Sequence, residues 1–375
     1  MESPAQVNGL LNENRLRSVS AREKILRAAA ILLILIAGGY FRFTGLTWGG
    51  YEYPHPDERF LIWVVADIAP VSSLGEYFDT ALSPLNPANR GHQFYVYGDF
   101  PVILTRYMAE MLSDQVGWEQ ILQVGRSLSA LFDLLTVLLV FLIAERLSGW
   151  RVGALAGLFA AGAVLQIQQS HFFTVDSFAA CFTTLAVYLA VLLAGDSASE
   201  TRQAAVKREL RLGLLFGAAV GLAMACKLNT LPVAGLLPAA LAARWLRAGG
   251  DARQKRLAEL AGAALAGGLA AFLVFRLAQP YAFAGPGFFG LGIDKTWLKS
   301  IRDLSVQSAG DVDFPPALQW ARRPVWFSLQ NLVLWGLGVP LAVTAWTGFG
   351  LLAVILFRLA FGGRGASRWR VLLSP

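Results

Sequence analysis

Residues 25–46 read ILRAAAILLILIAGGYFRFTGL, and residues 53–60, a few positions later, read YPHPDERF. The first stretch supplies the roughly 20 apolar residues that a helix needs to cross a bilayer core. Five basic residues precede or open it: Arg15, Arg17, Arg22, Lys24 and Arg27. Such a charge bias keeps the flanking segment in the cytoplasm. We therefore expect residues 1–24 to form a cytoplasmic tail, with Asp57 and Glu58 emerging on the opposite, exoplasmic side.

The composition is that of a membrane protein. Hydrophobic residues make up 55% of the 375 residues and charged residues only 15%, and the apolar residues come in repeated long runs, unlike those of a soluble domain. We therefore predict an all-α, multi-pass protein of the plasma (inner) membrane. The net charge of +7 could indicate nucleic acid, but most Lys and Arg residues lie in short loops between apolar runs. This positive-inside pattern excludes a nucleic-acid partner from our expectations.

The apolar runs predict eight spans, at residues 25–46, 123–145, 152–166, 172–194, 212–226, 230–243, 257–277 and 340–360. Alternation from a cytoplasmic N-terminus then places the basic clusters that follow every second span on the cytoplasmic side. We expect one transmembrane domain from residue 25 to residue 375. The chain ends in a basic segment with no closing span after it, and a C-terminally truncated form would have such an end.

Two predicted exoplasmic loops, at about residues 48–118 and 280–330, are long and rich in aromatic residues. Within the first loop, residues 60–68 and 100–111 are apolar but interrupted by charges. We predict that these segments are helices lying at the membrane interface.

The acids Asp57 and Glu58 are the first candidates for chemistry. A solvated pair of loop acids is the simpler interpretation, but Pro54 and Pro56 rigidify the approach and a predicted helix starts at once. Carboxylates at a helix N-terminus are favourably placed. Such a group could accept a proton from an incoming hydroxyl.

Charged residues inside apolar runs are the second set of candidates. Asp176 lies one turn into a span, where an acid is costly unless it is paired or faces a cavity. It could be a structural partner of Lys227 or Arg126. Lys227 could snorkel to the interface or, with Arg126, bind a lipid phosphate. Asp133 is expected to make a hydrogen bond between helices.

The order of a cytoplasmic N-terminus, one span, an exoplasmic Asp-Glu motif and interfacial helices resembles the GT-C glycosyltransferase superfamily. Within it the sequence resembles the branch of the protein O-mannosyltransferases and the aminoarabinose transferases. Four further segments, up to about residue 280, resemble elements of this branch: residues 91–95 (GHQFY), 125–130 (GRSLSA), 170–178 with Asp176, and Cys226-Lys227. The 91–95 segment lacks the prolines of its counterpart.

The resemblance implies a GT-C-like helical bundle that transfers a sugar from a polyprenyl-phosphate donor to a hydroxyl group, with inversion, at the exoplasmic face. The acceptor would be a protein, a glycolipid or a cell-wall polymer. Asp57 would be the general base, supported by Glu58 and Asp176. Contacts to the substrates would come from Arg59, His92, Tyr95, Arg126, His171 and Lys227.

Three alternatives stay open at this point. His55, His92 and His171 could join Asp57 in a divalent-metal site, although no two of them have ligand spacing on one helix, and we expect no cofactor. A transporter or flippase of a lipid-linked saccharide would use Asp133, Asp176, Lys227 and Arg276 along a pathway. The third alternative is a scaffold without activity.

Overall fold

In the computed structural model, residues 20–113, 115–195, 201–248 and 252–361 are described. The predicted cytoplasmic tail, except for its last residues, and the basic C-terminal segment lie outside these ranges. Regular structure in the described residues is helical, apart from one isolated bridge between Phe283 and Ile293. The predicted all-α class is therefore confirmed.

Five of the helices are long and apolar enough to cross a membrane. Four of them are the complete helices α2 (Ala21–Phe43), α6 (Trp118–Ser148), α9 (Val175–Ala194) and α10 (Arg202–Cys226). The fifth is the part of α12 (Ala252–Ala278) from residue 256 to residue 278. A sixth crossing is possible if α7 (Trp150–Ala161) and α8 (Val164–Ser170), bent by 57° at their junction, act as one broken span. The protein is thus a multi-pass membrane protein.

One of the eight predicted spans is not a single α-helix. Residues 230–243 form a 3-10 helix, η2 (Leu228–Gly235), followed by the 12-residue α11 (Leu236–Arg247). Pro232 lies inside η2, where it removes a backbone donor and prevents a continuous α-helix. The last predicted span, residues 340–360, corresponds to α16 (Val339–Phe361), a helix of 23 residues.

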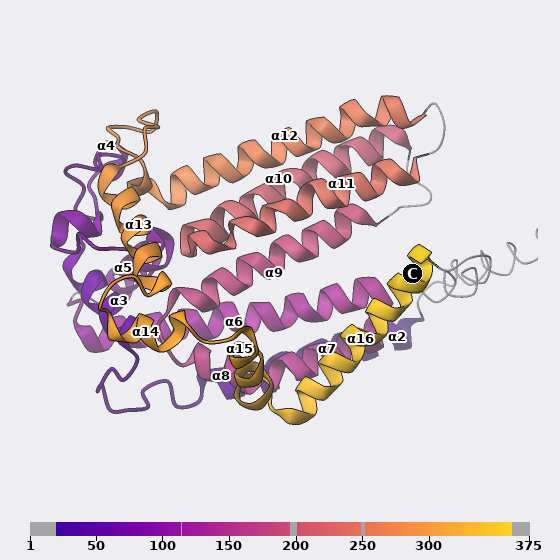
Figure 1. The fold of residues 1–375 in the computed structure, drawn as a ribbon, viewed down its shortest axis with the longest axis horizontal. Helices are drawn as coiled ribbons and strands as arrows, with labels where there is room; N and C mark the ends of the chain where they lie inside the picture. Colours follow the sequence, from indigo (N-terminus) through magenta and orange to yellow (C-terminus); the bar gives the residue numbers. More distant parts are fainter. Residues whose placement is uncertain (1–19, 114, 196–200, 249–251, 362–375) are drawn as a thin grey trace, which may run out of the picture.

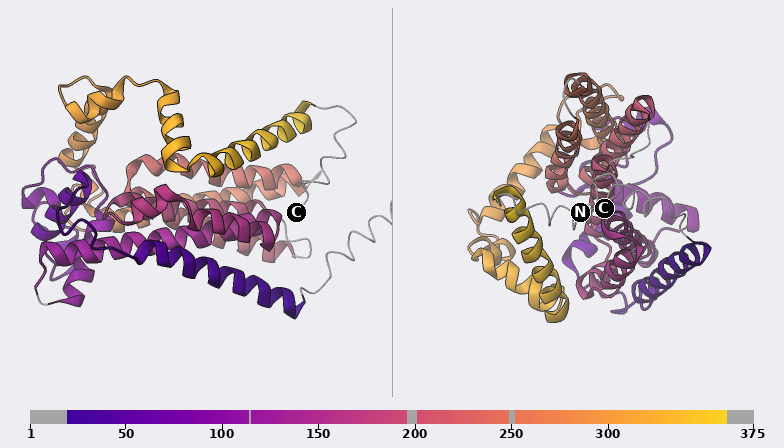
Figure 2. Two further views of the ribbon diagram at one scale, coloured as in Figure 1. Left: turned by 90° about the horizontal axis from the view of Figure 1, so that it is seen from below. Right: turned by 90° about the vertical axis from the view of Figure 1, so that its right-hand side faces the viewer.

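The shorter helices gather at one end of the bundle, which we call the loop end (Figure 1). The predicted interfacial segments are α3 (Pro56–Asp67) and α5 (Asp99–Leu112). The remaining short elements are α4 (Leu74–Tyr77), η1 (Pro87–Arg90), η3 (Pro280–Ala282), α13 (Lys295–Ala309), α14 (Pro315–Ala321), α15 (Val325–Asn331) and the π-helix η4 (Leu332–Gly336). Figure 2 shows α16 running beside the bundle, away from the loop end.

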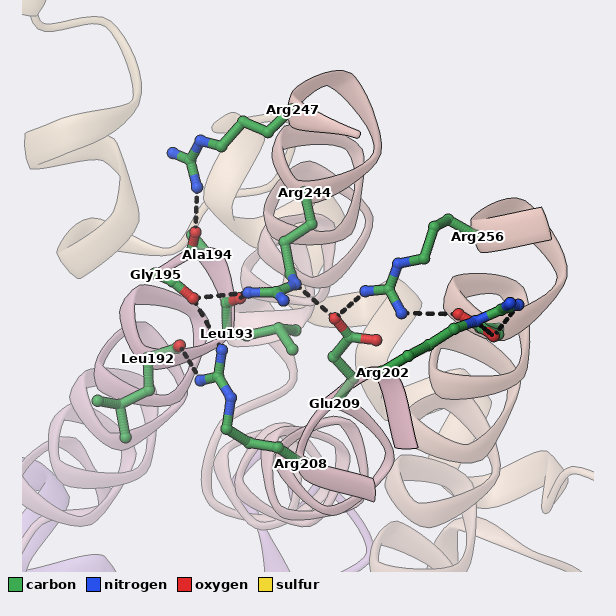
Figure 3. A network of polar contacts seen from close by, with 11 residues as sticks. Leu192, Leu193, Ala194, Gly195, Arg202, Arg208, Glu209, Arg244, Arg247 and Arg256 are labelled. Atoms are coloured by element: carbon green, nitrogen blue, oxygen red, sulfur yellow. Dashed lines mark hydrogen bonds and ion pairs between the residues drawn. The ribbon is translucent and has the colours of Figure 1, made fainter. Parts of the chain in front are cut away.

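Arginines gather at the other end, which we call the arginine end (Figure 3). Arg208 and Arg244 donate to the carbonyl of Gly195, just after the last turn of α9. Arg244 and Arg256 also bind the buried carboxylate of Glu209. Cations at a helix C-terminus interact favourably with its dipole. The network therefore fastens the end of α9 to α10, α11 and α12.

Two hydrophobic cores support these ends. One joins α3, α5, α6 and α9 at the loop end, where Leu61, Val102, Ile121 and Phe178 are fully buried. The second joins α9, α10, α11 and α12. Because the first core packs the short helices α3 and α5 directly on α6 and α9, the side chains at the loop end are held in fixed positions.

Candidate active site

Helix α3 begins where the chain turns back onto the bundle. Pro56 is the first residue of the helix, and the ring Nδ1 of His55 accepts a hydrogen bond from the Asp57 N–H, at 3.2 Å. Proline at the first position and a capping side chain before it are strong start signals for a helix. Asp57 and Glu58 therefore lie in the first turn, where their charges are stabilised.

The two neighbouring acids have different environments. Glu58 is fully buried and accepts two hydrogen bonds from Arg126, at 2.7 and 2.8 Å. It also accepts the Phe173 N–H at 2.8 Å. Asp57, the preceding residue in the same turn, is half-buried. Glu58 thus holds α3 against α6 and against the turn that precedes α9, while Asp57 keeps access to solvent.

Arg126 does not lie where a lipid phosphate could reach it. Its side chain is 1% exposed. Its third nitrogen, Nη1, does not bind Glu58 but is also occupied, since it donates to the carbonyls of Leu46 and Trp48 at 2.6 and 3.1 Å. From the sequence we predicted that Arg126 contacts the substrate, because its partner Glu58 is 68 residues away and is not apparent there. The side chain instead positions Glu58.

Gly125, beside Arg126, allows α6 to approach the turn before α9. A Cβ at this position would lie 2.3 Å from the ring of Phe173. Glycine is therefore required for the close packing that brings the Phe173 N–H to Glu58.

The segment 95–98 carries a tyrosine that sequence analysis did not single out. Burial and the nearby carboxylates of Asp57 and Asp176 raise the pKa of Tyr97. Tyr97 therefore remains protonated, with a hydroxyl that could donate to an acceptor near Asp57. Tyr97 follows Tyr95 by two residues in a loop rich in aromatic residues, and no sequence signal distinguishes it from aromatic residues that lie at the membrane interface.

Gly98 fixes this segment on the end of α10. Its N–H donates to the Cys226 carbonyl at 3.0 Å, and a Cβ here would lie 1.9 Å from the Ala225 oxygen. Only glycine permits this approach. Because Lys227 directly follows Cys226, the contact brings Tyr97 close to the charged end of α10.

Asp176 and Lys227 form an ion pair, with 2.8 Å between the lysine Nζ and the carboxylate Oδ1. Their side chains are 38% and 37% exposed. Of the two structural partners that the sequence left open for Asp176, the structure shows Lys227. Because Tyr97 is influenced by both Asp57 and Asp176, one partly open site contains the first acid, the tyrosine and the ion pair.

The other predicted substrate contacts fall into two groups. Arg59, exposed on the first turn of α3, has a side chain without a hydrogen bond or ion pair among the described residues. His92, Tyr95 and His171 are already engaged. His92 contacts Asp67 at 2.8 Å, the Tyr95 hydroxyl donates to the Gly98 carbonyl at 2.8 Å, and both ring nitrogens of His171 face backbone carbonyls. These three shape the loop end.

The histidines of the divalent-metal alternative have other neighbours. No group of three or more His, Cys, Asp or Glu side chains in the described ranges is arranged to hold a metal ion. The ring of His55 packs against Phe172 with 4.7 Å between the centroids, while His92 packs against Trp63 at 5.0 Å.

Asp99 is a buried acid that sequence analysis missed. It is 1% exposed, and its Oδ2 accepts the Tyr281 N–H at 3.3 Å. Burial raises the pKa of Asp99 to about 8, so its carboxyl group is mostly protonated at neutral pH. In the sequence, Asp99 only directly precedes the predicted helix at residues 100–111, and an acid at the start of a helix is common.

Residues 118–278 match the family of the dolichyl-phosphate-mannose-protein mannosyltransferases. The stretch contains Arg126, Asp176 and Lys227 and begins after the Asp57 motif. No curated protein matches the sequence.

The fold is similar to that of the oligosaccharyltransferase of Archaeoglobus fulgidus. The apo crystal structure matches with a TM-score of 0.50 and 16% identity, over 95% of this chain and 40% of that chain. The structure tethered to an acceptor peptide with the NVT sequon matches with a TM-score of 0.51 and 15% identity, over 90% and 38%. The chain thus spans about 40% of the length of this relative. These likenesses confirm the predicted GT-C-like fold and support the resemblance to membrane glycosyltransferases.

Proposed function

We propose that this protein transfers a sugar from a polyprenyl-phosphate donor to a hydroxyl acceptor at the exoplasmic face of the plasma (inner) membrane. The observation that carries the proposal is the contrast within the first turn of α3. Glu58 is locked in a buried ion pair, whereas Asp57 is half-buried and lies by Tyr97 and the Asp176–Lys227 pair. A carboxylate held by its neighbours but open on one side suits a general base.

In the proposed reaction, Asp57 accepts the proton of the acceptor hydroxyl. The acceptor oxygen attacks the anomeric carbon of the donor sugar from the face opposite the phosphate, so the configuration inverts. The bond from this carbon to the phosphate oxygen breaks, and polyprenyl phosphate leaves with the electron pair.

Negative charge then grows on the leaving phosphate. Lys227 and Arg59 have partly or fully exposed side chains at the loop end and are the cations that would contact it. A cation that meets charge as it develops lowers the barrier more than it strengthens donor binding. Asp176 holds the Lys227 ammonium in place, and Arg126 acts indirectly, through Glu58.

The transporter alternative requires charges along a pathway through the bundle. Asp133 is 4% exposed and binds Arg42 at 2.6 Å, which also confirms the expected contact between helices. Arg276 is fully buried and donates to the carbonyls of Pro280, Gly287 and Phe288. These charges are internally satisfied, which favours the transferase.

The test is Asp57→Asn, which keeps the size of the side chain and removes its basicity. A positioned general base contributes typically about 10²–10⁴-fold, so turnover of the purified protein should fall by that factor while donor binding is retained. Released polyprenyl phosphate measures turnover, using a panel of polyprenyl-phosphate sugars. Glu52→Gln, at an exposed acid five residues earlier, is the matched control and should keep full activity. Unimpaired transfer by Asp57→Asn would remove Asp57 from the mechanism.

A further inference from the structure

A cavity of about 190 Å³ lies at the loop end, separate from the Asp57 site. Its floor contains the buried residues Tyr95, Asp99, Tyr281 and Ser300, and its rim contains exposed residues such as Gln93. At roughly 30 Å³ per molecule of liquid water, this volume corresponds to about six waters. A single sugar ring with its hydroxyl groups displaces a comparable volume.

The walls of the cavity come from two distant parts of the chain that are bonded together. The Thr80 hydroxyl donates to the Phe283 carbonyl at 2.6 Å, and Ser300 donates to the Gln93 carbonyl at 3.1 Å. The hydroxyls of Ser83 and Tyr281 lie 2.8 Å apart. These bonds join the first predicted exoplasmic loop to the segment that leads into α13. The cavity is therefore preformed, which reduces the cost of binding.

The chemistry of the lining selects the ligand class. It contains the carboxyl groups of Asp99 and Asp294 and no lysine, arginine or histidine. An anionic ligand would therefore find no cation. Amides, hydroxyls and protonated carboxyl groups can both donate and accept hydrogen bonds, as the hydroxyls of a sugar require. Burial keeps Asp99 largely protonated near neutral pH, so it adds a donor.

Aromatic rings complete the lining. Trp297, half-buried in the first turn of α13, lines the cavity together with Tyr95 and Tyr281. An indole offers a flat apolar face beside polar groups, which matches the apolar face of a pyranose or furanose ring. Pockets of this kind combine such a surface with a few placed polar groups.

From these features we propose that the cavity between residues 80–99 and the start of α13 binds one uncharged sugar ring. The cavity is close to the Asp57 site, because Tyr95, on its floor, has its ring centroid 6.1 Å from that of Tyr97. A sugar bound here is therefore a unit of the acceptor or of the donor saccharide. The assignment of the sugar to the acceptor or the donor rests on the proposed function, whereas the proposal that the cavity binds a sugar ring does not.

The experiment measures the binding of free sugars to the purified full chain, in a detergent without a sugar headgroup. Saturation-transfer NMR titrations use glucose, mannose, galactose, arabinose and N-acetylglucosamine as neutral probes and glucuronate as the anionic probe. At least one neutral sugar should bind, and glucuronate should bind more weakly. Absence of binding by all neutral probes, or equal affinity for glucuronate, would overturn the proposal.

Variants locate the bound sugar. Trp297→Ala should weaken the affinity about tenfold, the upper range for one aromatic contact. Trp297→Phe should retain most of it, which also shows that α13 still folds. Trp326→Ala, at a tryptophan that is 66% exposed, is the matched control and should bind like the unchanged protein. An unaltered affinity in Trp297→Ala contradicts the assignment.

Asp57→Asn separates this inference from the proposed function. The variant should bind the neutral sugar normally even if it transfers none. Loss of sugar binding in Asp57→Asn would place the ring at the reaction site and reject the cavity. In the active protein, a raised KM of Trp297→Ala for the acceptor assigns the ring to the acceptor, and a raised KM for the donor assigns it to the donor.

Discussion

Removing the charge of Glu58 should destabilise the protein more than any comparable change at an exposed acid. Three donors bind this carboxylate, Arg126 through two nitrogens at 2.7 and 2.8 Å and Phe173 through its N–H at 2.8 Å. Both charged side chains are buried. In Glu58→Gln the Arg126 guanidinium stays buried without its counter-ion, and breaking such a pair costs about 3–5 kcal/mol. The ratio of folded to unfolded protein should fall by roughly 10²–10⁴-fold.

The assay is SDS titration of the purified protein, followed by far-UV circular dichroism. The matched control is Glu145→Gln, because Glu145 forms a similar two-bond pair with Arg27 on α2. Those side chains are 20% and 44% exposed, so the control should lose only about 0.2–1 kcal/mol. The double variant Glu58→Gln/Arg126→Gln should recover part of the loss because no charge remains buried. Equal losses in Glu58→Gln and Glu145→Gln would refute the reasoning.

Three further predictions follow from the loop end and the predicted topology. Lys227→Gln should lower turnover by about 10²-fold with little loss of donor affinity, and it should fold normally since its ion pair with Asp176 is more than a third exposed; an unchanged single-turnover rate would reject the phosphate role. Because the pKa of Asp99 is raised to about 8 by burial, the folded state holds a proton that the unfolded state loses at acid pH. The free energy of unfolding should therefore decrease as pH rises from about 4 to 8 and level off above, whereas Asp99→Asn should show a flatter profile; identical pH profiles would contradict the shift. In intact cells, a membrane-impermeant thiol reagent should label Leu82→Cys, at a 77% exposed position, and not Gln203→Cys, while the buried native cysteines stay silent; the reverse labelling would invert the topology.

Much of the fold could be predicted because the decisive signals are local. Runs of apolar residues identified all five long helices, and charge bias grouped their ends. The helices α3 and α5, which we predicted to lie at the membrane interface, followed from apolar stretches interrupted by charge. The prediction failed where an apolar run contains Pro232, since hydropathy does not register the lost backbone donor.

The candidate site was only partly predictable because its geometry depends on contacts between distant residues. Asp57, Asp176 and Lys227 stood out by their position in the sequence. Nothing local distinguished Glu58 from Asp57, and the partner of Glu58 lies 68 residues away. Tyr97 and Asp99 acquire their roles from α10 and from the segment after α12, which no pattern in the first loop encodes.

Helix α9 is bound to its neighbours at both of its ends, so it should resist separation of the bundle. Asp176 in its first turn is tied to Lys227 at the end of α10, and its last carbonyls are tied to Arg208 on α10 and Arg244 on α11. Lateral separation of α9 from α10 would have to break charge contacts at both membrane surfaces at once. The α9–α10 side of the bundle is therefore expected to resist opening.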